Sequence, residues 1–133
     1  MITAVADTHA VIWYIYADSR LSAIAKTAID SAAQAGDQIG VSAITLVEMV
    51  YLVEKGRISS ESFSILATSL KDAENVFTEI PMNLEIARMI TTIDAAQIPD
   101  MPDRIIAATA QDPGVPVISR DSQIQLSNVT TIW

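Results

Sequence analysis

Residues 2–13 read ITAVADTHAVIW, an apolar run of strand length that ends at Asp7 and is followed at once by helix-like sequence. The run 2–6 predicts a buried strand, and the apolar residues of 11–16 predict a helix after it. Strand-like and helix-like stretches continue to alternate along the chain, which is typical of a parallel sheet. The sequence therefore predicts an α/β fold in which Asp7 stands at the carboxyl end of the first strand.

The other expected elements follow from periodicity and from helix start and stop signals. Strands are expected at 38–41, 76–80, 115–119 and 129–133. Helices are expected from Ser19 or Ser22 to about Gln34, and at 45–55, 59–70, 84–93 and 104–110. The helix at 84–93 is expected to bury Ile86, Ala87, Met89 and Ile90, and the two prolines of 98–102 predict a loop.

Composition limits the class of protein. A length of 133 residues with 50% hydrophobic residues predicts one globular domain over 1–133. No apolar stretch approaches the roughly 20 residues of a membrane span, so a soluble, cytoplasmic protein is expected. The chain has no cysteine and a single histidine, so a metal would be held mainly by oxygen, which favours Mg²⁺ or Mn²⁺. A net charge of −8 argues against broad electrostatic binding of nucleic acid.

Three further acids resemble Asp7 in standing inside or against apolar sequence. They are Glu48 in ITLVEMVYL, Asp103 in MPDRIIAATA and Asp121 in VISRDSQI. Sites in α/β sheets gather at the carboxyl ends of strands, so four such acids suggest convergence on a divalent cation. Each aspartate also has a simpler interpretation as a helix cap. Glu48 lacks this alternative, because it lies within a helix that is apolar nearly all round.

Four segments, in this order, are similar to those of the PIN-domain ribonucleases and, among them, the VapC-type toxins. They are the strand-Asp7-Thr8-His9 opening with Trp13, the run SAIT at 42–45 leading to Glu48, the run PDRIIAATA at 102–110, and ISRD at 118–121. The resemblance covers nearly the whole chain. It implies a three-layer α/β/α fold with a central parallel sheet of about five strands. The acidic composition is the one departure, since an enzyme that cuts RNA ordinarily has a more basic surface.

The resemblance also implies a function. Asp7, Glu48, Asp103 and Asp121 would be the catalytic carboxylates of a Mg²⁺- or Mn²⁺-dependent endoribonuclease. Asp7, Asp103 and Asp121 are the expected metal ligands, and Glu48 would bind through water or orient the nucleophile. Thr8, Ser119 and Arg104 are candidate supporting residues, although a helix cap, a strand-end hydroxyl and a solvated arginine are the simpler interpretations. The implied partners are RNA, a small antitoxin that blocks the acidic groove, and a second copy of the chain.

Two other classes of function agree less well with these residues. A phosphate-transfer domain fits poorly: a receiver domain would need a second acid beside Asp7 and a late lysine, and no lysine follows Lys71. A dehalogenase-type phosphatase would need aspartate at position 9, which is His9. The remaining alternative is a PIN-like module that binds proteins without catalysis. Retention of all four acids argues against it, and EDTA-sensitive cleavage of RNA separates the two.

Overall fold

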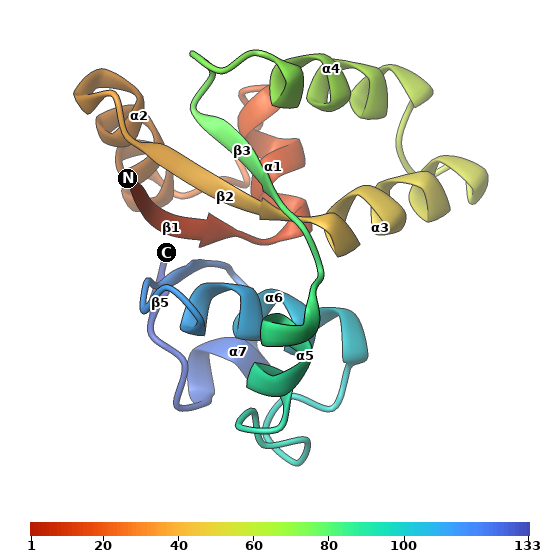
Figure 1. Ribbon diagram of the computed structural model, residues 1–133. Helices are drawn as coiled ribbons and strands as arrows, with labels where there is room; N and C mark the ends of the chain where they lie inside the picture. Colours follow the sequence, from red (N-terminus) through yellow and green to blue (C-terminus); the bar gives the residue numbers. More distant parts are fainter.

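The computed structural model describes all 133 residues. Twelve elements follow one another along the chain: β1 (Ile2–Ala6), α1 (Thr8–Ile15), α2 (Ala23–Ala35), β2 (Gln38–Ser42), α3 (Ala43–Glu54), α4 (Ser60–Lys71), β3 (Phe77–Ile80), α5 (Leu84–Ile90), α6 (Met101–Gln111), β4 (Val117–Ile118), α7 (Ser122–Leu126) and β5 (Thr131–Ile132). Helices and strands alternate as predicted (Figure 1). None of the helices has the length and hydrophobicity needed to cross a membrane.

The five strands form one sheet in the order β3-β2-β1-β4-β5, and every neighbouring pair is parallel. β1 therefore lies in the middle, and the direction in which strands are added reverses between β1 and β4. In sheets of this kind the reversal leaves an open crevice at the carboxyl ends of the two central strands. The predicted α/β fold with a five-stranded parallel sheet is confirmed.

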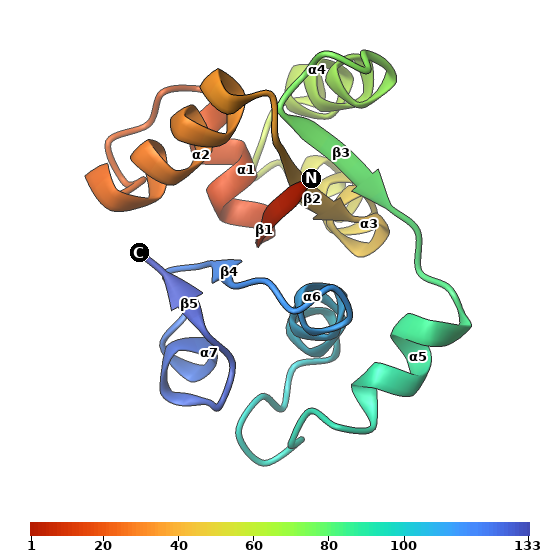
Figure 2. The same cartoon turned by 60° about the vertical axis from the view of Figure 1, so that its left-hand side comes forward.

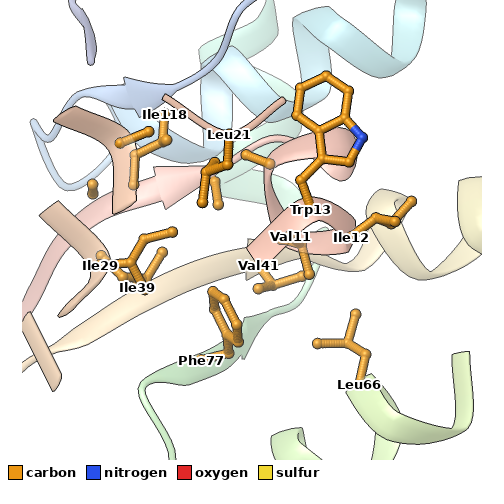
Figure 3. Close-up of a cluster of buried hydrophobic side chains, with 14 of the residues drawn as sticks. Val11, Ile12, Trp13, Leu21, Ile29, Ile39, Val41, Leu66, Phe77 and Ile118 are labelled. Carbon is orange, nitrogen blue, oxygen red and sulfur yellow. The ribbon is translucent and has the colours of Figure 1, made fainter. Parts of the chain in front are cut away.

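Helices cover both faces of the sheet. α1, α2 and α4 lie on one face and α5, α6 and α7 on the other (Figures 1 and 2). The side chains of β1 alternate accordingly: Ala4 and Ala6 join the core cluster under α1 and α2, whereas Val5 joins the cluster under α6. The first cluster includes Val11, Val41 and other apolar side chains drawn together in Figure 3. The result is the expected three-layer α/β/α arrangement.

Local sequence signals explain several boundaries. The hydroxyl of Ser22 accepts a hydrogen bond from the N–H of Ala25, which caps the start of α2. Gly36 ends the same helix with φ of +74°, a left-handed conformation that costs glycine little. Asp7 has extended backbone angles and caps α1 directly after β1. The chain thus passes from the central strand into a helix at the first of the predicted site residues.

Some predicted boundaries were wrong. α6 begins at Met101 and not at 104, because Asp100 caps it and Pro102 is tolerated in the first turn. α5 ends at Ile90 and not at 93, and of its predicted buried residues only Ile86 is fully buried, while Ala87 is exposed. α3 begins at Ala43, two residues early, because Ser42 supplies the cap. The last two strands are shorter than predicted, β4 by three residues and β5 by three.

Candidate functional site

A cleft of about 510 Å³ opens at the carboxyl ends of the central strands. Asp7 follows β1, and Asp121 follows β4, the neighbouring strand. α3 contributes Glu48 and α6 contributes Asp103. All four predicted acids line this one cleft. The other residues that line it are Thr8, His9, Trp13, Arg20, Asp100, Ile106 and Arg120. The four acids therefore face one cleft, whereas their binding of a cation stays a prediction.

Asp7 is both a helix cap and a cleft residue. Its N–H donates to the carbonyl of Ile118 on β4 (3.0 Å), which fixes it between the two central strands. Its Oδ1 accepts from the N–H of Ala10 (2.9 Å). Burial raises the pKa of the Asp7 carboxyl, while the hydroxyl of Ser119 and the N–H of Ala10 act in the opposite direction. The simple interpretation as a cap is correct, and it does not remove Asp7 from the site.

Asp121 has the same double position. Its Oδ1 accepts from the backbone N–H groups of Gln123 (2.9 Å) and Ile124 (3.1 Å) at the start of α7. The buried hydroxyl of Ser119 accepts from the N–H of Asp121 (3.0 Å). The Ser119 hydroxyl thus bonds to the backbone, as its simpler interpretation predicted, and it also lowers the pKa of the Asp7 carboxyl, although Ser119 lies outside the lining of the cleft. It shapes the turn that presents Asp121.

Glu48 is held by a chain of two threonines. The hydroxyl of Thr8 donates to Oε1 of Glu48 at 2.6 Å. The hydroxyls of Thr8 and Thr45 are 3.1 Å apart, and because the single proton of Thr8 goes to Glu48, Thr45 must be the donor to Thr8. Burial raises the pKa of Glu48; the bond from Thr8 lowers it, and the nearby carboxylate of Asp100 raises it. Thr8 thus supports the site through its side chain.

Asp103 lies in the first turn of α6 without capping it. The cap is Asp100, whose Oδ2 accepts from the N–H of Asp103 (3.2 Å). The Asp103 side chain is consequently free of the helix and faces the other acids of the cleft. Burial, followed by the charges of Asp121, Asp100, Glu48 and Asp7, raises the pKa of Asp103 to about 7. The suggestion that Asp103 is only a helix cap is wrong for this structure.

Three charged residues of the cleft were not predicted from the sequence, namely Asp100, Arg20 and Arg120. Asp100 had a usable signal: an aspartate shortly before a proline is a common helix start. The two arginines had none, since they are separated by 99 intervening residues. Conversely, Arg104 is not part of the cleft lining. Arg104 is half-buried and its Nε is buried without a hydrogen-bond partner, so it is only in part the solvated arginine of the simpler expectation.

The donor chemistry of the cleft fits a divalent cation such as Mg²⁺ or Mn²⁺. Five carboxylates face it, and carboxylate oxygen is the ligand these hard cations prefer. Burial and, after it, the repulsion of the other carboxylates raise the pKa of Asp103, and a bound cation would relieve that repulsion. As the side chains stand, no three of them come together closely enough to hold a metal ion. Two of them, Asp7 and Asp121, instead direct an oxygen at backbone N–H groups.

Comparison with known proteins agrees with this geometry. The PIN domain family matches residues 4–129. Ribonuclease VapC22 of Mycobacterium tuberculosis is 29% identical over 136 residues, covering 100% of both chains. Among solved structures, VapBC2 from Rickettsia felis bound to a promoter DNA fragment has a TM-score of 0.71 at 16% identity, covering 98% of this chain and 97% of that one. A toxin–antitoxin complex from Klebsiella pneumoniae has a TM-score of 0.65 at 24% identity, with coverages of 92% and 90%. Because the family match spans nearly every element, including all four acids of the cleft, the chain belongs to the PIN domain family.

Proposed function

We propose that this protein is a metal-dependent endoribonuclease that hydrolyses RNA phosphodiester bonds at the carboxylate cleft. The observation that carries this proposal is the convergence of four acids from four elements on one cleft, where the strand order of the sheet reverses. The relative in Mycobacterium tuberculosis, similar along its whole length, is named a ribonuclease, which supports the same activity here.

Asp7, Asp103 and Asp121 are the proposed ligands of Mg²⁺ or Mn²⁺. Such a cation, when bound, lowers the pKa of a water and offsets negative charge on the phosphate under attack. Oδ1 of Asp121 accepts both capping N–H groups, which leaves Oδ2 for a ligand. Oε1 of Glu48 accepts from Thr8, which leaves Oε2 to accept a proton from the attacking water. Thr8 and Ser119 act as positioning residues, and Arg104 has no part in the proposed site.

The proposed biological role is that of the toxin in a toxin–antitoxin pair, acting in the cytoplasm where its RNA substrate lies. Two of the structural neighbours are complexes of this class, which supports the idea of an antitoxin partner. α3 presents an exposed apolar stripe of Val47, Val50 and Tyr51, which is the proposed contact with an antitoxin or a second copy of the chain. α4 is less suited to such a contact, because its residues Ser62 and Leu66 are buried against the rest of the protein. Light scattering of the purified protein, alone and with the product of an adjacent reading frame, tests both partners.

The catalytic proposal is tested by incubating RNA with purified protein in Mn²⁺, in EDTA, and after Mn²⁺ is restored. Asp103→Asn should be inactive, whereas Asp112→Asn should retain wild-type activity. Asp112 is a matched control because it lies at the other end of α6, outside the cleft. Cleavage that persists in EDTA contradicts the metal mechanism. If the folded wild-type protein cleaves no RNA in Mn²⁺, the non-catalytic PIN-like module is the better description.

A further inference from the structure

Two of the eight basic residues of this acidic chain meet at the cleft. The guanidinium carbon of Arg120 lies 4.6 Å from the centroid of the Trp13 ring, and that of Arg20 lies 5.2 Å from it. Both distances are within the range of a cation–π contact. The two arginines are far apart in sequence, so their meeting is a product of the fold. It places positive charge at the rim of a cleft that is otherwise dominated by carboxylates.

Trp13 serves as a platform for the arginines and is not itself open to RNA bases. Its side chain is 5% exposed, and it lies at the periphery of the core cluster in Figure 3. The rings of His9 and Trp133 also pack against it, with centroids 5.5 and 5.9 Å away. A guanidinium held over an aromatic ring keeps its N–H donors at its edges, where they remain able to bind an anion.

The two arginines differ in their partners. Arg20 is paired with Asp18: its Nη2 donates to Oδ2 at 2.7 Å and its Nε to Oδ1 at 3.1 Å. Arg120 is exposed and makes neither a hydrogen bond nor an ion pair with any other residue. It immediately precedes Asp121 in the chain, yet it contacts Trp13 instead of the neighbouring acids. Arg120 is therefore the cation at the cleft whose donors are not already used.

We propose that Arg120, held over Trp13, binds a phosphate of the RNA strand next to the one that is cleaved. This inference rests on the proposed ribonuclease function. Five carboxylates in the cleft repel an RNA backbone, so a strand needs a fixed positive group beside them to stay in place. Arginine suits this task because its planar donors match phosphate oxygens in pairs. Arg20, neutralised by Asp18, completes the support of Trp13 and leaves the phosphate to Arg120.

The test compares Arg120→Gln with Arg120→Lys and with Lys55→Gln. Lys55 is the matched control: its Nζ lies 5.3 Å from the Tyr51 ring, so the variant removes one charge and one cation–π contact outside the cleft. Binding of a fluorescein-labelled single-stranded RNA of mixed sequence is followed by anisotropy in Mg²⁺ over a range of salt concentrations. Each variant is made in an Asp7→Asn background to prevent cleavage. KM and kcat are measured separately in the wild-type background.

Arg120→Gln should weaken RNA binding about tenfold and reduce the slope of log K against log salt by about 0.7, the value for one phosphate contact on a single strand. In the cleavage assay KM should rise more than kcat falls. Arg120→Lys should restore most of the salt slope. Lys55→Gln should bind RNA with the same affinity and salt slope as the Asp7→Asn protein without a second substitution. If the wild-type protein cleaves RNA but the salt slope of Arg120→Gln is unchanged, the phosphate site is overturned and the ribonuclease proposal stands.

Two other results would also overturn the assignment of Arg120. A lower melting temperature of Arg120→Gln with an unchanged salt slope would make Arg120 a structural cover for Trp13. Loss of affinity for a protein partner with unchanged RNA binding would assign Arg120 to that interface. If the wild-type protein cleaves no RNA, the proposed function fails, whereas the binding series still decides whether Arg120 contacts phosphate.

Discussion

The four acids of the cleft form two pairs that are held in different ways. Asp7 and Asp121 each accept hydrogen bonds from backbone N–H groups at the start of a helix. Glu48 accepts only from the hydroxyl of Thr8, and the side chain of Asp103 accepts no hydrogen bond. The first pair therefore stabilises the fold as well as facing the cleft, whereas the second pair bears its charge with little local compensation. Capping a helix and lining a site are compatible roles for one carboxylate.

The largest effect is expected from Asp7→Asn. Asparagine caps a helix about as well as aspartate, so the fold should persist while the charge is lost. Cleavage of RNA should fall by more than the roughly 10–100-fold typical of residues that only support metal ligands. Turnover in Mn²⁺ and far-ultraviolet circular dichroism measure the two properties. Wild-type turnover in a folded Asp7→Asn protein would remove Asp7 from the proposed metal site.

Thr8→Val tests the hydrogen bond from Thr8 that holds Glu48. It preserves side-chain shape but removes the donor to Oε1, one of the contacts that lowers the pKa of Glu48. We expect cleavage to fall about tenfold, as is usual for a residue that orients a catalytic group. The acidic limb of the pH profile should also move to higher pH, because the pKa of Glu48 rises further. Thr8→Ser retains the hydroxyl and should retain both activity and profile; equal losses in the two variants would assign the effect to packing.

Asp103→Asn should raise the stability of the metal-free protein. The folded pKa of Asp103 is about 7, above the ordinary value of 3.8. Its contribution to stability is complete below the unfolded pKa and is lost progressively as the pH rises through the folded value. Because Asp103 is partly exposed, solvent screening reduces the effect to on the order of 1 kcal/mol, or about 4 °C in Tm.

Thermal unfolding in EDTA and in millimolar Mn²⁺, at pH 5 and pH 7.5, measures this difference. In EDTA the advantage of Asp103→Asn over wild type should be larger at pH 7.5 than at pH 5. Mn²⁺ should stabilise the wild-type protein by mass action, and it should stabilise Asp103→Asn much less. If Mn²⁺ does not change the melting temperature of the wild-type protein at pH 7.5, and Asp103→Asn is less stable than wild type in EDTA, the acids share no metal site.

The smallest effect concerns the caps themselves. Asp121→Ala removes Oδ1, the one oxygen that accepts from both capping N–H groups of α7, and should cost about 0.5–1 kcal/mol relative to Asp121→Asn, which can still cap. Glu48→Ala and Glu48→Gln should show no such capping difference, since Glu48 lies inside α3. Urea unfolding of the four variants checks the comparison. Equal midpoints for the two Asp121 variants would show that its hydrogen bonds in α7 contribute nothing to stability.

The sequence was most informative where one local signal acted alone. The start of α2 was narrowed to Ser19 or Ser22, its end was expected within a residue of where it lies, and the strand that ends at Asp7 was predicted, because each depends on residues close in the chain. The convergence of the four acids followed from the rule that parallel strands place their carboxyl ends at one edge. These features depend on short-range chemistry and on a general property of the fold.

Other features depend on contacts between distant segments and escaped prediction. The start of α6 was misplaced because Pro102 was interpreted as part of a loop, although proline fits the first turn of a helix. Asp100 was missed for the same reason. The meeting of Arg20 and Arg120 at Trp13 has no local signal, since it requires the loop after α1 and the turn after β4 to approach each other. Only the three-dimensional structure reveals this basic rim.

The central position of β1 affects the moment at which the protein can become active during its own synthesis. Translation delivers Asp7 before the other acids of the cleft, but the strand that completes its surroundings, β4, is made more than a hundred residues later. Until β4 and the turn to Asp121 have left the ribosome, the cleft lacks one wall and one of its acids. A ribonuclease built in this order would stay harmless to the messenger RNA that encodes it until β4 and the turn to Asp121 have been made and have folded onto β1.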